Sequence, residues 1–195
     1  MLKKVFRWSI KSIKIFYMDY IFFTGLLGSL VLVTGAAWPE SKKSVKPIKS
    51  VKDWLFAFGG VLMLFYAILG YNVGGSVFFV FLEVLVVVAS ILMMLDIDDR
   101  IDFVVILISG VAFIIWSLLL FEGYNTVFFI IGLSAIGLGY AFKMGTLRRN
   151  LALTFGSVLI AIFSYLSASF LFFWLNVFFA VFSFYYVVLG LKNKI

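Results

Sequence analysis

Two polar residues lie deep inside apolar stretches of the chain, and both carry groups that can bind a ligand. Glu83 stands about seven residues into its stretch, or roughly 10 Å at ~1.5 Å per helical residue. An ionised carboxylate at such a depth in a membrane is costly, so we expect Glu83 to face a polar cavity, to pair with a cation or to stay protonated. Asn176 has a neutral amide that both donates and accepts hydrogen bonds.

Each of these residues also has a purely structural interpretation. A neutral Glu83 can hydrogen-bond to a Ser or Asn of a neighbouring helix, and Asn176 can form a similar bond between helices. Trp116 and Tyr165 can stack on a ring or sugar face of a ligand, but such aromatic residues are more often packing residues or interface anchors. We take Glu83, Asn176, Trp116 and Tyr165 as the candidate substrate-binding residues.

Most catalytic chemistry is excluded by residue types that the chain lacks. It contains no Cys and no His, so it has no thiolate, no disulfide and no imidazole for acid–base work near neutral pH. A retinal-type pigment needs a lysine in the middle of a span, whereas the last apolar stretch has Lys192 and Lys194 only at its end. Intramembrane proteolysis needs a Ser/His pair or paired aspartates at membrane depth. We therefore expect no enzyme activity and no cofactor.

Aspartates gather in one polar break of the chain, at Asp96, Asp98, Asp99 and Asp102. Carboxylate oxygens are the ligands that divalent cations prefer, but this cluster lacks the ligand spacing of a cation-binding loop. The break is therefore predicted to be a solvated connector, and no metal site is expected.

Composition indicates which elements position these residues. Hydrophobic residues make up 65% of the 195 residues, charged residues only 13%, and the mean hydropathy is +1.19, which indicates an integral membrane protein. Helices are favoured, because the apolar stretches do not alternate as strands of a membrane barrel do. The sequence predicts an all-α polytopic helix bundle with about seven transmembrane spans, near 17–38, 54–70, 76–95, 102–121, 126–142, 150–167 and 169–191.

The net charge of +7 indicates topology rather than binding of nucleic acid, because the basic residues flank apolar spans instead of covering a polar domain. Lys and Arg are absent from the breaks at 70–75, 122–125 and 167–169 and present in the alternate breaks. By the positive-inside rule, spans two to seven form three hairpins whose charged ends and C-terminus lie in the cytoplasm. We expect the cytoplasmic membrane of a bacterium, with the lipid bilayer as a partner and a homo-oligomer as an open alternative.

The first segment, residues 1–16, is predicted to be a basic amphipathic helix on a membrane surface, followed by the single transmembrane domain of residues 17–195. Its basic residues, which fall on one helical face, are Lys3, Lys4, Arg7, Lys11 and Lys14. They conflict with the positive-inside rule if span 17–38 crosses once. We expect a true first span with an external N-terminus; a re-entrant segment at residues 18–38 is the alternative.

Internal repeats link the spans in pairs. Phe58-Gly59-Gly60 recurs as Phe155-Gly156-Ser157, the segment from Ser76 to Val84 recurs as that from Ser169 to Val177, and Gly70-Tyr71-Asn72 recurs as Gly123-Tyr124-Asn125. Spans one to three also match spans five to seven, where Phe22-Phe23 aligns with Phe128-Phe129. Duplication within a hydrophobic chain is typical of transporters whose binding site lies where the repeats meet.

Three helices, a linker helix and three helices form a layout that resembles the SWEET and PQ-loop superfamily, including the Pnu-type vitamin transporters. The resemblance covers about residues 54–195 and is carried by Leu147-Arg148-Arg149, Phe163-Ser164-Tyr165 and Asn176; the proline–glutamine dipeptide is absent. It implies that Asn176, in the third helix of a bundle, lies at the substrate site, and that Glu83 occupies the corresponding place in the first copy.

These observations together predict a transporter of a small polar solute, of the vitamin, nucleoside or sugar class, in which repeated bundles rock around a midplane site. One alternative is a membrane subunit that does not transport, in which Glu83 and Asn176 contact other helices with no cavity between them. A second alternative is an ion channel, which requires a ring of polar groups.

Overall fold

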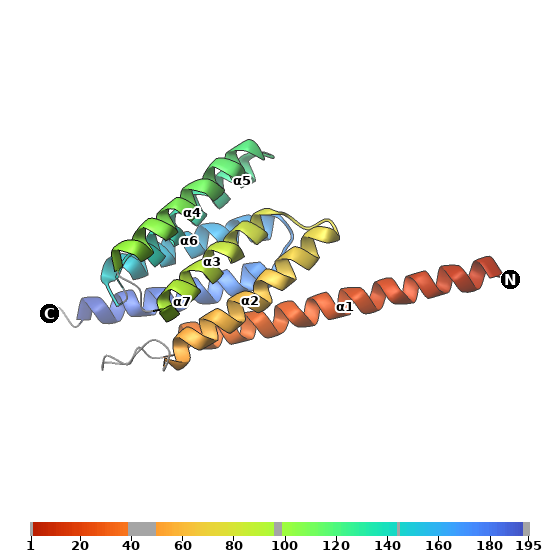
Figure 1. Ribbon diagram of the computed structural model, residues 1–195, viewed down its shortest axis with the longest axis horizontal. Helices are drawn as coiled ribbons and strands as arrows, with labels where there is room; N and C mark the ends of the chain where they lie inside the picture. Colours follow the sequence, from red (N-terminus) through yellow and green to blue (C-terminus); the bar gives the residue numbers. More distant parts are fainter. Residues whose placement is uncertain (1, 39–49, 96–98, 144, 193–195) are drawn as a thin grey trace.

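A computed structural model of the protein describes residues 2–38, 50–95, 99–143 and 145–192. This part of the chain contains seven α-helices and no strand, which confirms the predicted all-α fold (Figure 1). The helices are α1 (Leu2–Ala37), α2 (Val51–Asn72), α3 (Phe78–Leu95), α4 (Asp99–Leu119), α5 (Tyr124–Ala141), α6 (Leu147–Leu166) and α7 (Phe170–Lys192). All seven are long and apolar enough to cross a membrane, and each predicted span matches one of them to within a few residues.

The first helix is continuous from Leu2 to Ala37, and its apolar span is Asp19–Ala37. At ~1.5 Å per residue its 36 residues extend for about 54 Å, which is longer than the hydrocarbon core of ~30 Å. The N-terminal part of α1 therefore extends past the other helices (Figure 1). The predicted surface segment 1–16 is helical and joins the first span without a break; its location on a membrane surface stays a prediction.

Six helices form a closed ring. Going round it, α1 packs on α2, α2 on α3, α3 on α5, α5 on α6, α6 on α7, and α7 on α1. The seventh helix, α4, lies outside this ring against α3 and α5, the two helices it connects. The order is that of two three-helix bundles, α1–α2–α3 and α5–α6–α7, joined by a linker helix. This is the predicted layout of three, one and three helices.

The two ends of the bundle differ in charge. The turns of the three predicted hairpins, at residues 73–77, 120–123 and 167–169, carry no Lys or Arg and lie at one end, which we call the turn end (Figure 1). Lys52, Arg100, Lys143 and Arg149 lie at the start of α2, α4 or α6 or just after α5, at the opposite end, which we call the basic end. The candidate residues Glu83 and Asn176 lie within α3 and α7, between these two ends.

Matching glycines allow the same close contact in both bundles. A Cβ atom on Gly59 of α2 would come within 2.9 Å of the backbone N of Leu32 in α1. A Cβ atom on Gly156 of α6 would come within 2.8 Å of the backbone N of Ile136 in α5. Only residues without a side chain let two helix backbones approach this closely. The repeated Phe-Gly motif is therefore a helix-packing motif, used once in each bundle.

The same contacts define how α1 corresponds to α5. Gly28 of α1 contacts Met63, four residues after Gly59, and Gly132 of α5 contacts Ile160, four residues after Gly156. Gly28 and Gly132 are therefore equivalent. This register differs by two residues from the alignment of Phe22-Phe23 with Phe128-Phe129 suggested by sequence, because the closely packed glycines must correspond, whereas the aromatic residues do not occupy matching environments: Phe23 is exposed and Phe129 is fully buried.

Candidate functional site

Glu83 and Asn176 line one cavity of about 30 Å³ in the centre of the ring. Glu83 is 1% exposed on α3, and Asn176 is 5% exposed on α7. The other lining residues come from α1, α3, α5, α6 and α7: Leu32, Leu82, Val86, Ile136, Tyr140, Leu153, Ser157, Leu175 and Phe179. The acid and the amide that stand out in the sequence thus face the same space, although they are far apart in the chain. We call this space the central cavity.

The side-chain polar atoms of Glu83 and Asn176 differ in whether they have a hydrogen-bond partner. The Nδ2 atom of Asn176 donates a hydrogen bond of 2.8 Å to the backbone O of Phe172, one turn earlier in the same helix. The Oε2 atom of Glu83 is buried and has no hydrogen-bond partner among the described residues. A buried carboxyl oxygen without a partner is costly, because nothing replaces the water that it loses. The described residues therefore leave the Oε2 atom of Glu83 without a hydrogen-bond partner in this cavity.

The central cavity lies where the two bundles meet. Glu83 and Asn176 occupy the same position in the repeated segments that begin at Ser76 and Ser169. Most of the other lining residues also form equivalent pairs across the ring, namely Leu32 with Ile136, Leu82 with Leu175, and Val86 with Phe179. The lining of the cavity therefore has approximate two-fold symmetry. Glu83 and Asn176 depart from this symmetry, because an acid on one side corresponds to an amide on the other.

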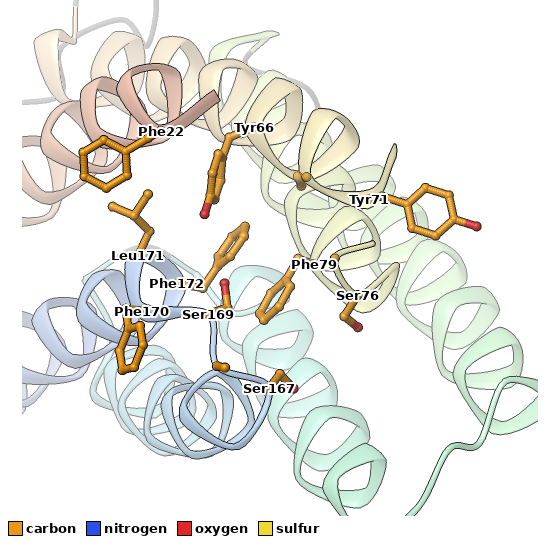
Figure 2. Close-up of a pocket in the computed structure, with 14 residues that line it drawn as sticks. Phe22, Tyr66, Tyr71, Ser76, Phe79, Ser167, Ser169, Phe170, Leu171 and Phe172 are labelled. Carbon is orange, nitrogen blue, oxygen red and sulfur yellow. The ribbon is translucent and has the colours of Figure 1, made fainter. Parts of the chain in front are cut away.

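A larger pocket of about 350 Å³ lies at the turn end of the ring. We call it the vestibule. Its walls are formed by α1, by the α2–α3 hairpin and by the α6–α7 hairpin, and Figure 2 shows its lining residues. Small-molecule sites usually measure about 300–1,000 Å³, so the vestibule is large enough for a small solute.

The lining of the vestibule is aromatic and hydroxyl-rich, and none of its lining residues is charged. The side chains of Tyr66 and Ser169 form a hydrogen bond. In Figure 2 the Tyr66 hydroxyl points toward Ser169 and Phe172, whereas Tyr71 points away from the pocket. The vestibule thus offers ring faces and hydroxyl groups to a ligand, and no counter-ion.

Two stacked rings line the vestibule one helical turn from Glu83 and Asn176. Phe79 and Phe172 lie face to face, with ring centroids 4.1 Å apart and planes at 5°. They are equivalent residues of the two bundles, and each precedes Glu83 or Asn176 by one helical turn. Both rings line the vestibule, but neither lines the central cavity. The stack therefore lies one helical turn from the acid and the amide, on the side of the vestibule.

A third cavity, of about 40 Å³, adjoins the central cavity toward the basic end. We call it the basic-end cavity. It shares Tyr140, Leu153 and Phe179 with the central cavity. Its other polar residues include Lys52, Asp53, Arg149 and Asn150, and the Arg149 guanidinium carbon lies 5.8 Å from the centre of the Tyr140 ring. Lys52 is equivalent to Arg149, and Asp53 to Asn150, so here too an acid faces an amide across the ring.

Two of the four predicted binding residues lie away from these cavities. Trp116, on α4, is 55% exposed and packs on Phe81, and Tyr165, on α6, is 61% exposed and packs near Phe173. Neither lines the central cavity, the vestibule or the basic-end cavity. Asp96 and Asp98 of the predicted connector lie outside the described residues, and the described part of the chain contains no cluster of acidic residues that could hold a metal ion.

Several residues that line these cavities were not predicted from the sequence, because residues of the same types are common elsewhere in the chain or at a membrane interface. Tyr66 and the Asp53–Asn150 pair lie near helix ends, where polar residues are unremarkable. Phe79 and Phe172 are two of 25 phenylalanines. The repeat could have found the stack and the second acid–amide pair, because equivalent positions that face a two-fold axis must face each other.

Comparisons with protein-family models, with curated proteins and with solved structures give no significant match to this chain.

Proposed function

We propose that the chain transports a small uncharged solute across a membrane by rocking the bundles α1–α2–α3 and α5–α6–α7 about the central cavity. The observation that carries this proposal is the position of Glu83 and Asn176, which come from different bundles and line one cavity where those bundles meet. Transporters with repeated bundles bind their substrate at such a midplane interface.

The arrangement of cavities also favours transport. Alternating access requires a site that is open to one side while the other side is closed. The vestibule lies at the turn end, the Phe79–Phe172 stack lies one helical turn from Glu83 and Asn176 on the side of the vestibule, and the small basic-end cavity adjoins the central cavity on the other side. A membrane subunit that does not transport has no need for a cavity with an acid and an amide at this interface, and an ion channel has no use for a stack of two rings across its path.

The lining of the vestibule indicates the class of solute. Five aromatic side chains (Phe22, Tyr66, Phe79, Phe170, Phe172) and the hydroxyls of Ser76, Ser167 and Ser169 suit a neutral molecule that combines a ring with hydroxyl or amide groups. Nucleosides, neutral vitamins and sugars have this chemistry. An anion or a cation would lose its hydration there without gaining a counter-ion.

Uptake by the purified full chain in liposomes tests the proposal. The probes are radiolabelled uridine, nicotinamide and glucose, one from each solute class, and liposomes without protein give the background. We expect saturable uptake of at least one probe. Asn176→Leu should lower that uptake by about tenfold, the equivalent of one hydrogen bond of about 1.4 kcal/mol to the solute.

The control for Asn176→Leu is Ser90→Ala. Ser90 is fully buried and bonds to the backbone O of Val86 in its own helix, as Asn176 bonds to Phe172, but it lines none of the three cavities. Uptake should be the same with and without this substitution. Equal loss in both variants would mean that Asn176 only supports the fold, and absence of saturable uptake of all three probes would contradict the proposal.

A further inference from the structure

The central cavity has room for water but no cation for its acid. A volume of about 30 Å³ is larger than the ~10–15 Å³ that a cavity needs in order to hold one water molecule. Among the described residues that line it, Glu83 is the only acid, and Lys and Arg are absent. Because the Oε2 atom of Glu83 is buried and without a hydrogen-bond partner, a ligand of that oxygen must come from the cavity itself.

The titratable groups around Glu83 are few. Tyr140 of α5 lines the same cavity. The guanidinium of Arg149 in α6 lies over the Tyr140 ring, but Arg149 does not line this cavity. From α2, Lys52 and Asp53 line the adjoining basic-end cavity, and Tyr66 lines the vestibule. From α4, neither Arg100 nor Asp102 lines any of the three cavities. No described base therefore shares the cavity with the Glu83 carboxyl.

A proton fits this site better than a metal cation does. Hard cations need a shell of several oxygen ligands, and transporters often supply these as carbonyls of unwound helices. The helices that line the central cavity are continuous at this depth, so their backbone carbonyls are engaged in helical hydrogen bonds. The remaining oxygens, from Glu83, Asn176, Ser157 and Tyr140, are too few for such a shell among mainly apolar neighbours.

We infer that Glu83 binds and releases one proton in each transport cycle, so that movement of the solute is coupled to a proton gradient. The inference rests on the proposed transport function. One carboxylate oxygen of Glu83 accepts the proton from water when the cavity is open to one side, and the carboxyl returns it to water on the other side. The shared wall of Tyr140, Leu153 and Phe179 places the basic-end cavity on the route to that side.

The equivalent residue in the other bundle supports this role for a single acid. Asn176 occupies the position that corresponds to Glu83 and is stable there as a neutral amide. An uncharged side chain of this size therefore suits the site, and packing alone does not require a carboxyl group. The acid adds the ability to change charge, which is the property that energy coupling uses.

Accumulation in proteoliposomes tests the coupling with uridine, nicotinamide or glucose, whichever the chain takes up. With one proton per solute, a gradient of one pH unit should accumulate the probe about tenfold. In Glu83→Gln the ratio of accumulation with and without the gradient should fall to one. The control is Glu122→Gln, an exposed acid in the α4–α5 turn that should keep the tenfold ratio. Accumulation driven by sodium instead, or a tenfold ratio that survives in Glu83→Gln, would overturn the inference.

Infrared spectroscopy gives a second measurement that does not depend on transport. The carbonyl stretch of a protonated carboxyl, taken as the difference between the wild-type chain and Glu83→Gln in lipid, should vanish reversibly as the pH is raised. If Glu83→Gln no longer transports any probe, this measurement still shows whether the Glu83 carboxyl takes up and releases a proton. A band that persists at every pH at which the protein stays folded would make Glu83 a permanently neutral structural residue. A band absent at every such pH would mean that it never takes up a proton.

Discussion

At the residue scale, the face-to-face pair of Phe79 and Phe172 is the contact that the proposed transport function would require to open. The two rings belong to different bundles, so in the proposed mechanism rocking of the bundles separates them before a solute passes from the vestibule to Glu83. A stacked aromatic pair contributes about 0.5–1.5 kcal/mol beyond its buried area. In the proposed transport cycle this energy stabilises the stacked, closed state and is lost when the two bundles move apart.

Phe79→Leu should therefore raise downhill uptake of the transported probe by about two- to tenfold, as the stacking energy of the closed state is lost. The measurement is the initial rate of tracer entry into proteoliposomes. Phe81→Leu is the matched control, because Phe81 lies on the same helix and stacks on Phe113 of α4, at 5.4 Å and 14°, outside the ring. Equal rates in the two variants would mean that the stack does not limit access.

The sequence predicted Glu83 and Asn176 for a physical reason that does not extend to the rest of the site. A carboxyl or amide inside an apolar span is costly wherever it faces lipid, so its presence indicates a polar neighbourhood without any knowledge of the fold. Trp116 carries no such cost at a lipid-facing position, and it is found exposed on α4. Which aromatic residues face the path depends on helix rotation, and the nearly uniform apolar surface of these spans does not reveal that rotation.

At the element scale, glycines determine how closely the helices of each bundle approach. Gly156 lies against both the backbone N of Ile136 and the backbone O of Gly132, so any side chain there forces α5 and α6 apart. The spans themselves were predictable from hydropathy, because about 20 apolar residues are required to cross a bilayer. The correspondence between the helices of the two bundles was less predictable. The alignment of α1 with α5 depends on Gly28 and Gly132, and the similar apolar residues around these glycines hide that alignment in the sequence.

Gly156→Ala should destabilise the protein by about 1–3 kcal/mol, because the added methyl group meets backbone atoms that cannot move independently. The measurement is thermal or denaturant unfolding of the purified chain in detergent. Gly110→Ala serves as the control: a Cβ atom at Gly110, within α4, meets no atom within 4 Å, so stability should be unchanged or slightly higher. Equal loss in both variants would argue against close packing of α5 on α6.

At the scale of the whole molecule, the separation of charge between the two ends predicts the orientation in the membrane. The turn end lacks Lys and Arg, whereas Lys52, Arg100, Lys143 and Arg149 lie at the basic end. By the positive-inside rule the basic end faces the cytoplasm. In that orientation we expect the vestibule to open toward the outside, and the proposed coupling then predicts that the proton leaves Glu83 toward the cytoplasm.

The absence of cysteine makes this orientation simple to test, since a single introduced thiol is the only one in the chain. Glu122 and Lys143 are both exposed, in the α4–α5 and α5–α6 connections at opposite ends. A membrane-impermeant maleimide applied to intact cells should label Glu122→Cys and should label Lys143→Cys only after permeabilisation. The reverse pattern would place the vestibule on the cytoplasmic side.

The pairing of an acid with an amide across the two-fold axis has a consequence for how the proposed carrier can be built. A homodimer of identical three-helix units must present the same side chain from both halves, so its axis would hold two carboxyls or two amides. Two carboxyls across one small hollow repel each other, and two amides carry no charge at all. Joining both halves in a single polypeptide, with α4 as the tether, permits one titrating group opposite a permanent dipole, and with it a stoichiometry of one.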